Sequence, residues 1–297
     1  MPILARVIGS IEDLRGYLRE DTSCDPTVLP QSLLFAYSND LSPQTVSDTL
    51  YALATIRNDW CVGSTWFGSV RFDFTGNIDI VFNSGFEDIN STIYDNLPDP
   101  SQGFQNSSIG SNVFDVIEFK PLLSLTLLQN FFSNTEAPVC GSVIVILLKR
   151  YPNEADISRL VSLIRYHHAV LHVITSTTPS GRSQQNTMYS MASKTNGMGA
   201  FEYDENFRVV IQELPLSDFV YPVYATTIQV SGSGMKTLPD FYSFKNYYQW
   251  IAITYQDHGW RNLYSSVGGF SSSQLQYEFG LQLFGSGCAE SPDSDLR

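Results

Sequence analysis

A short polar segment that follows an apolar run carries the residues best suited to chemistry near the start of this chain. The run Ser32–Tyr37 leads into Ser38-Asn39-Asp40-Leu41, and a helix start follows at once in Ser42-Pro43-Gln44-Thr45. Hydroxyl, amide and carboxylate oxygens are the groups that can hold a divalent cation or a polar ligand. The order of strand, polar loop and helix predicts a first strand that presents a ligand-bearing loop at one edge of an α/β sheet.

Three histidines, His167, His168 and His172, form the second group whose residue types could bind a metal. The segment lacks the glutamate of a zinc-protease helix, and we expect it to straddle a helix end and a strand, so the imidazoles would not converge. His167 and His168 are typical of a helix C-terminus, where the helix dipole favours them. The sequence contains no Gly-x-Ser-x-Gly elbow and no phosphate-binding loop. We therefore expect no enzyme activity, catalytic residue, metal or cofactor.

Composition limits the partners that this protein can have. The chain has 297 residues and a net charge of −13, from 30 acidic and 17 basic side chains. Nucleic-acid binding needs clustered Lys and Arg, so this class of partner is not expected. No apolar run approaches the roughly 18 residues that a membrane-spanning helix requires, so no membrane span is expected. Hydrophobic residues make up 43% of the chain, enough for a sizeable core and two domains.

The compartment is suggested by cysteines and glycosylation sequons. The four cysteines are widely spaced, which allows two disulfides or four buried free thiols, and both readings stay open: Cys24, Cys61, Cys140 and Cys288. Two sequons, at Asn90 and Asn106, lie in the polar stretch 83–111, which we expect to be a long loop. The N-terminus has no signal-peptide pattern. We predict an extracellular, secreted glycoprotein. Two readings reconcile this with the N-terminus and both stay open: the chain is part of a longer secreted protein, or its true start is missing.

Hydrophobic periodicity predicts strands that alternate with helices. The expected strands are 32–37, 69–74, 78–82, 142–148, 170–175 and 199–203, and the expected helices are 42–56, 113–132, 155–166 with Asn153 as its cap, and 183–196. Alternation of this kind indicates an α/β fold with a doubly wound, mostly parallel six-stranded sheet. The hairpin residues Thr75-Gly76-Asn77 add one antiparallel edge strand.

This order resembles a von Willebrand factor A domain. The likeness rests on the apolar strands Ser32–Tyr37 and Ser142–Leu148, and on Met188–Gly197 followed by Ala200-Phe-Glu-Tyr203, which is similar to that family's last helix and strand. It covers about residues 30–210. It implies a Rossmann-like sheet, a role in protein interaction or cell adhesion, and a metal-ion-dependent adhesion site that binds Mg²⁺ through an Asp-x-Ser-x-Ser loop, a later Thr and a second Asp.

The residues that this resemblance assigns to the metal site are mostly replaced. The Asp-x-Ser-x-Ser positions fall on Tyr37, Asn39 and Leu41, and a shifted alignment leaves Ser38 and Asp40 as oxygen ligands. The remaining matches are Ser111 at the Thr position and Lys149 or Arg150 at the second Asp. A cation there repels a divalent metal. We therefore expect a degenerate metal site, whose rim is available for ligand binding through Tyr37, Ser38, Asn39, Asp40, Ser111 and Arg150.

The C-terminal part of the chain has a different pattern. Runs of alternating, β-branched or aromatic residues at 224–230, 250–255 and 275–283 are separated by Gly- and Ser-rich turns. They predict a small antiparallel β-sandwich. We expect an N-terminal extension over 1–30, an A-type domain over 31–212, the β-module over 213–290 and a polar tail over 291–297.

Three functions are compatible with these features. The favoured one is a non-enzymatic protein that recognises an unknown extracellular partner, a protein or a glycan, without a metal. The alternative is a carbohydrate-binding protein that acts through the aromatic-rich β-module, with Tyr242, Tyr247 and Trp260 as contacts, because we expect these three in loops. For the aromatic cluster as a whole, we favour the reading that alternate rings fill a sandwich core. A Rossmann-like enzyme would need a glycine-rich loop after the first strand, and Tyr37–Ser42 supplies none.

Overall fold

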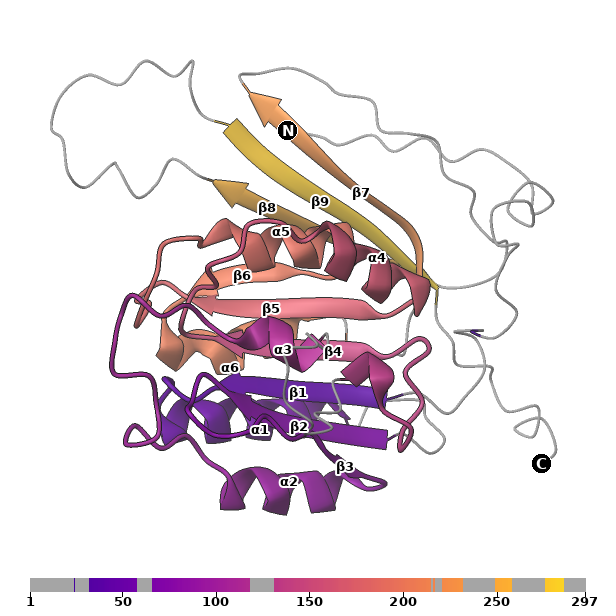
Figure 1. Cartoon of the computed structure of the whole chain (residues 1–297). Coiled ribbons are helices and arrows are strands. Elements are labelled where there is room, and N and C mark those ends of the chain that lie inside the picture. Colours follow the sequence, from indigo (N-terminus) through magenta and orange to yellow (C-terminus); the bar gives the residue numbers. More distant parts are fainter. Residues whose placement is uncertain are drawn as a thin grey trace, which may run out of the picture. The chain divides into compact units, whose positions relative to one another are not determined.

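The chain forms two compact units in a computed structural model (Figure 1). One unit is Cys24–Phe219, and the other combines Met1–Ser23 with Val220–Arg297. The structure describes residues 24, 32–57, 66–117, 131–214 and 216, and three strands within 221–285. The boundaries predicted after residues 30, 212 and 290 stay predictions.

The Cys24–Phe219 unit is built on a six-stranded sheet in the order β3-β2-β1-β4-β5-β6. Its strands are β1 Ser32–Ser38, β2 Trp66–Phe72, β3 Val81–Asn83, β4 Val143–Leu148, β5 Val170–Ser176 and β6 Gly199–Glu202. All neighbours are parallel except β2 and β3, which are antiparallel. This confirms the mostly parallel sheet with one antiparallel edge strand. The arrowheads of β1, β5 and β6 point to the same edge, on the left in Figure 1.

Helices cover both faces of this sheet. On one face lie α1 Pro43–Arg57, α2 Phe86–Asp95 and α6 Phe207–Glu213, and on the other lie α3 Val113–Ile117, α4 Ser158–Tyr166 and α5 Asn186–Lys194. Successive side chains of a strand point to opposite faces. Leu33 and Phe35 therefore pack with the first set of helices, whereas Leu34 and Ala36 pack with the second. The doubly wound arrangement is confirmed.

The central strands are the most buried elements of the unit. All seven residues of β1 are buried, and so is every residue of β4 after Val143. Each fully buried Val, Leu or Ile side chain contributes about 1.5–3 kcal/mol relative to its exposed state. This burial on both faces explains why the two strands read as nearly continuous apolar runs, and it fixes where their polar ends emerge.

Two helices were not expected from the sequence. Residues 83–111 were predicted to be a loop, but Phe86–Asp95 forms α2, whose apolar side chains Phe86, Ile89 and Ile93 are buried. These apolar residues stand at positions one, four and eight of the helix, which is the spacing of one helical face. The many polar residues of the segment hide this spacing in the sequence. Helix α6 was missed because only Phe207 and Ile211 of its seven residues are buried.

Several predicted boundaries also need correction. Strand β3 starts at Val81, not at Ile78, because Phe74 forms an isolated bridge with Gly103 and the chain is irregular in between. The helix expected from residue 155 begins at Ser158, and its N-cap position is Ile157, which makes no side-chain capping bond, so the cap expected at Asn153 is not found. Asp156 Oδ1 accepts the Ser158 N–H at 3.0 Å in the turn that precedes the helix. Of the helix expected over 113–132, residues 113–117 are α3, 131–133 are a 3₁₀ turn, and the rest lies outside the described residues.

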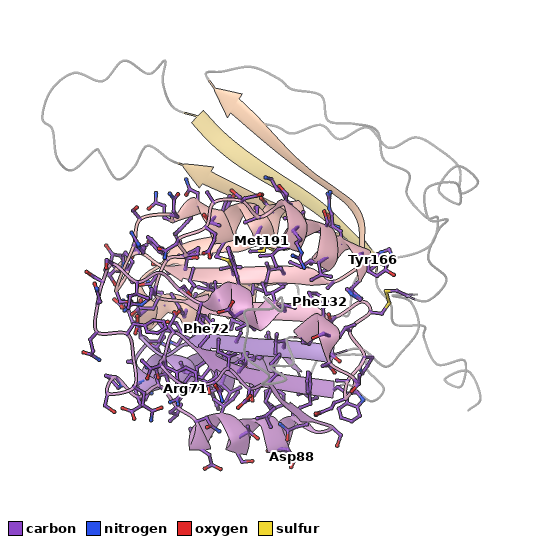
Figure 2. The ribbon with its side chains drawn as sticks, in the orientation of Figure 1. Arg71, Phe72, Asp88, Phe132, Tyr166 and Met191 are labelled. Atoms are coloured by element: carbon purple, nitrogen blue, oxygen red, sulfur yellow. A yellow bond between two sulfur atoms is a disulfide. The ribbon has the colours of Figure 1, made fainter. Side chains whose placement is uncertain are left out.

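One disulfide joins the start of this unit to the turn before β4. Cys24 and Cys140 are bonded, with Cα atoms 5.4 Å apart and a sequence separation of 116. Figure 2 shows it as the yellow sulfur–sulfur bond beside Tyr166, and the Cys24 sulfur lies 3.4 Å from the carbonyl oxygen of His167. The open choice between disulfides and thiols is thus resolved for this pair. Cys61 and Cys288 lie outside the described residues.

The second unit contains one antiparallel sheet among its described residues. Strands β7 Tyr221–Ser231, β8 Gln249–Asp257 and β9 Gln276–Gly285 pair in the order β7-β9-β8. The three strands match the three predicted runs. A sandwich needs a second sheet, which the described part of this unit does not contain, so the sandwich stays a prediction. The same holds for Tyr242, Tyr247 and Trp260, which lie outside the described residues.

We predict that the Cys140→Ser variant is less stable than the oxidised wild type by about 2–5 kcal/mol, because the bond restricts a long loop in the unfolded chain. Urea unfolding with and without a reductant measures the difference. Reductant should lower the midpoint of the wild type and leave that of the variant unchanged. An equal response of both chains would show that the stabilisation comes from elsewhere.

Candidate functional site: the carboxyl-terminal edge of the sheet

Loops that follow β1, β2, β4 and β5 meet at one edge of the parallel sheet. After β1 the chain turns at once into α1, because the Ser42 hydroxyl caps the helix by accepting the Thr45 N–H at 3.0 Å. The turn holds Asn39 and Asp40 close to the strand end, with the Asn39 N–H donating to the Phe72 carbonyl at 2.7 Å. The predicted N-cap at Ser42 is confirmed.

Asp73 occupies the centre of this edge, directly after β2. Its carboxylate accepts the hydroxyls of Ser38 and Ser111, each at 2.6 Å, and the Asn112 N–H at 3.2 Å. The Asp73 N–H in turn donates to Asn112 Oδ1 at 2.7 Å. Its φ of 63° lies in the left-handed region, which Asp tolerates better than most residues. Asp73 thereby links the ends of β1 and β2 to the segment before α3.

Burial sets the charge of this carboxyl group. Desolvation raises the pKa of Asp73 from 3.8 to about 7, while the hydrogen bonds from Ser111 and Ser38 oppose the rise and the nearby charge of Asp40 adds to it. The group is therefore divided between its acid and carboxylate forms near neutral pH. Either form fits, because a serine hydroxyl can donate or accept.

Arg150, two residues after β4, is the buried cation of the edge. Its Nε donates to Asp40 Oδ2 at 2.7 Å, and the two side chains are only 3% and 11% exposed. Its other nitrogens donate to three backbone carbonyls at 2.9–3.0 Å: Asn106 and Ile109 from Nη1, and Phe104 from Nη2. The Ser180 hydroxyl also donates to Asp40 Oδ2. This guanidinium holds the loops after β1, β4 and β5 and the segment 104–109 together.

Lys149 makes a second set of bonds on the other side of β4. Its ammonium donates to Asp204 Oδ2 at 2.6 Å, Thr178 Oγ1 at 2.7 Å and Ser176 Oγ at 3.1 Å. The Ser176 hydroxyl donates to Asp204 Oδ1 at 2.5 Å. Lys149 thus connects the ends of β4, β5 and β6, as Arg150 connects the end of β4 to β1.

A structured segment, residues 96–112, lies across the ends of β1 and β2; we call it the strap. Tyr37 donates its hydroxyl to the Asn96 carbonyl at 2.8 Å, and Asn39 exchanges two 2.8 Å hydrogen bonds with the backbone of Asp99. Arg71, labelled in the lower left part of Figure 2, donates to the Leu97 carbonyl at 2.9 Å. The strap is therefore bonded to the sheet along most of its length.

The structure brings the six predicted rim residues to this one edge but places most of them in its interior. Tyr37, Ser38, Asn39, Ser111 and Arg150 are buried, and Asp40 is partly buried. These buried residues fix the positions of the loops at the edge, and a partner would contact the exposed residues around them. Ligand binding at this edge stays a prediction. Leu41 packs in the hydrophobic core and does not face the site. Of the two alignments with the family's metal loop, the shifted one, which puts the oxygen ligands at Ser38 and Asp40, therefore agrees with the structure.

These residues do not fit the divalent cation that the fold family implies. Ser38 and Ser111, which would supply hydroxyl ligands, both bind Asp73, and Asp40 binds Arg150. Mg²⁺ requires about six oxygens in a tight shell, and a guanidinium beside them opposes it by Coulomb repulsion. Among the described residues, no three His, Cys, Asp or Glu side chains gather as metal ligands.

The other candidate residues are dispersed. Burial lowers the pKa of His172, which lies in β5, to about 4, and its Nδ1 accepts the Met198 N–H at 3.2 Å. His167 stacks on Phe132 with ring centroids 4.8 Å apart, and His168 is exposed. The three histidines therefore lie in different surroundings: one in β5, one against an aromatic ring and one exposed. No helix in the described ranges is long and apolar enough to cross a bilayer.

Sequence reasoning missed Asp73, Ser180 and Gly181. Asp73 was assigned to the interior of a strand, and only the glycine and polar residues after it suggested that the strand ends there. Gly181 lies against the guanidinium: a Cβ at this position would be 2.5 Å from Arg150 Nη1 and 2.7 Å from the Ser107 carbonyl oxygen. Nothing in the sequence pattern singles this glycine out.

Comparison with solved structures gives likenesses of low identity. A von Willebrand factor type A structure from Catenulispora acidiphila is 8% identical, with a TM-score of 0.42, over 85% of this chain and 57% of its own. Proximal thread matrix protein 1 from the mussel byssus is 13% identical, with a TM-score of 0.41, over 69% of this chain and 50% of its own. The SpRpn10 VWA domain is 12% identical, with a TM-score of 0.38, over 63% of this chain and 96% of its own. This chain therefore spans about half the length of the mussel and Catenulispora chains it matches.

Sequence comparison adds one match in the second unit. A family model described as a domain of unknown function (DUF7154) matches residues 226–279. No curated protein matches the chain. For the first unit, the strand order, the antiparallel edge strand and the helices on both faces are those of a von Willebrand factor A-like fold, which is the fold expected from the sequence.

We predict that Arg150→Ala lowers the free energy of unfolding by about 3–5 kcal/mol, because it leaves the buried Asp40 carboxylate without its cation. Removing the guanidinium also removes the charge that repels a divalent metal. Millimolar Mg²⁺ should therefore raise the melting temperature of the variant and leave that of the wild type unchanged. Thermal unfolding monitored by circular dichroism measures both.

Gly181→Ala provides a second variant that retains the charge. Its added methyl group displaces the guanidinium, so we expect a loss of stability without any response to Mg²⁺. A wild type that Mg²⁺ stabilises as strongly as the Arg150→Ala variant would contradict the assignment of Arg150 as the cation of this edge.

We predict that Asp73→Asn changes how stability depends on pH. Burial raises the pKa of Asp73 in the folded chain. The protonated carboxyl group therefore contributes its full stability below about pH 4, and this contribution is lost as pH rises through about 7. The variant should therefore gain up to about 4 kcal/mol relative to the wild type between pH 4 and pH 8. Urea unfolding across this range measures the difference. The opposite effect of His172 is common to both chains and cancels, so parallel pH profiles would contradict the prediction.

Proposed function

We propose that this chain is a non-enzymatic recognition protein, which binds another protein at the carboxyl-terminal edge of its A-like sheet without a divalent cation. The observation that supports this most directly is the Arg150–Asp40 ion pair, 2.7 Å long and nearly inaccessible to solvent. In the metal-ion-dependent adhesion site that the family resemblance implies, a carboxylate of the partner completes the ligand shell of the metal. Here a side chain of the protein supplies the positive charge.

A preformed edge favours binding because few groups lose freedom when the partner arrives. The strap is fixed by Tyr37, Asn39, Arg71 and Arg150, and the loop after β5 by Lys149. No ion has to bind before these bonds form. The surface that they support should therefore have the same shape in the presence and absence of Mg²⁺ or Ca²⁺.

Two exposed apolar side chains at this edge are the best candidate contacts. Ile109, in the strap, is 41% exposed, and Tyr203, directly after β6, is 55% exposed. Large apolar residues surrounded by polar ones commonly contribute most of the binding energy in protein interfaces. Exposed polar neighbours complete this surface: Gln105, Ser107, Ser108, Thr178, Arg182 and Gln184.

The polar groups of the edge also fit a binding role better than catalysis. The Ser176 hydroxyl lies next to the Lys149 amine, but Ser176 is buried and Lys149 is bound to the Asp204 carboxylate at 2.6 Å, so neither group faces a position that a substrate could occupy. Asp73 is buried beneath two hydroxyls. The Cys24–Cys140 disulfide supports an oxidising, extracellular compartment. The carbohydrate-binding alternative concerns residues outside the described part, so no observation here favours it.

The test is affinity capture with the full chain from extracellular fluid, in excess EDTA and in Mg²⁺. We expect the same protein partner in both buffers. The double variant Ile109→Asp, Tyr203→Asp should weaken its binding at least tenfold, because a charge replaces each apolar contact. Biolayer interferometry with the isolated partner measures the change.

Tyr51→Asp is the matched control, because Tyr51 is 71% exposed and is the ninth residue of α1, about two turns after the end of that helix that lies next to the edge. This variant should bind as the wild type does. Binding that EDTA abolishes, or that survives the double variant unchanged, would rule the proposal out.

A further inference from the structure

We infer that Asn106, and not Asn90, is the attachment site of an N-linked glycan. Both residues begin an Asn-x-Ser/Thr sequon, Asn90-Ser91-Thr92 and Asn106-Ser107-Ser108. The structure places them in different local environments. The inference rests on those environments and does not depend on the proposed partner surface.

Asn106 lies in the exposed part of the strap, in a turn closed by its own sequon. The carboxamide oxygen of Asn106 accepts both the N–H and the hydroxyl of Ser108, each at 2.8 Å. All three residues of the sequon are exposed. The hydroxyl that a sequon requires is therefore next to the carboxamide, and the amide nitrogen Nδ2 is left for reaction.

The backbone of this turn is fixed independently of the Asn106 side chain. The Asn106 carbonyl accepts from Arg150 Nη1 at 3.0 Å, and the Ser107 carbonyl accepts from the Arg182 N–H at 3.2 Å. The backbone is thus bonded to the protein, whereas the side chain is exposed. A glycan on Nδ2 breaks none of these bonds, and it keeps the two contacts that Oδ1 makes with Ser108.

Asn90 has the opposite arrangement, because its whole sequon lies in the middle of α2. Residues two apart in a helix are about 200° apart around its axis and do not face each other. The Thr92 hydroxyl donates to the Asp88 carbonyl at 2.9 Å and accepts from Asn83 Nδ2 at 3.4 Å, so it is used within the fold. Asn90 itself is partly buried. The sequon can adopt a turn only if α2 unfolds.

The reaction is transfer of an oligosaccharide from a lipid-linked pyrophosphate donor. The Asn106 Nδ2 forms a bond to the anomeric carbon of the first sugar, the bond from that carbon to the lipid pyrophosphate breaks, and Nδ2 loses one proton. No electron transfer is involved. The product carries its sugar on the strap, next to the exposed residues Ser107, Ser108 and Ile109.

The experiment is to express the full chain in a eukaryotic secretory host and to measure its intact mass before and after peptide N-glycosidase treatment. We expect one glycan and, after its removal, conversion of Asn106 to Asp in the corresponding peptide. Asn106→Asp and Ser108→Ala should each abolish the glycan. Asn106→Asp retains the oxygen that Ser108 binds, so the turn should persist and the variant should fold.

Two matched variants control for indirect effects. Ser108→Thr keeps the hydroxyl and should keep the glycan, and Asn90→Asp should leave the mass of the glycoform unchanged. A glycan that occurs at Asn90, a glycan that persists in Ser108→Ala, or a secreted folded chain without any N-glycan would overturn the inference.

Discussion

The buried ion pair between Arg150 and Asp40 is the interaction on which the carboxyl-terminal edge depends. A guanidinium that leaves water loses much hydration energy, and it is stable in the interior only if its hydrogen-bond donors find acceptors. Asp40 and three carbonyls of the strap meet this requirement. The same bonds give three strap carbonyls a charged donor. Arg150 therefore holds the strap in place, and the strap in turn supplies the acceptors that stabilise the buried charge of Arg150.

Two neighbouring cations after β4, Lys149 and Arg150, hold different loops of the edge. Consecutive residues at a strand end point to opposite sides, so Lys149 extends toward β5 and β6 while Arg150 extends toward β1 and the strap. β4 is one of the two central strands, and from its end two adjacent side chains reach both halves of the edge. In the metal site that the family resemblance implies, one bound ion connects some of these loops. In this chain, the side chains of Lys149 and Arg150 connect them.

The sequence predicted the sheet well, because its order is encoded in long apolar runs such as Ser32–Tyr37 and Ser142–Leu148, where burial on both faces leaves a clear pattern. It also indicated that a cation, Lys149 or Arg150, stands where the resemblance implies a ligand to the metal. It did not predict Asp73, whose role depends on a left-handed turn and on contacts with Ser38 and Ser111, 35 and 38 residues away. It also missed α2, because the single apolar stripe of Phe86, Ile89 and Ile93 is diluted by polar residues. Long-range polar contacts leave no period in a sequence, and this limits what can be inferred from it.

The Cys24–Cys140 bond has a mechanical consequence for a protein that is pulled by its ends. Tension that enters at Cys24 passes through the sulfur atoms directly to Cys140, just before β4. The segment between them, residues 25–139, includes β1, β2 and β3, carries no load and cannot be extended. Reduction would add roughly 400 Å of extensible chain. The disulfide thus shields the half of the sheet that contains Asp40 and the strap, and under force the described elements of this unit that can unravel are those after Cys140.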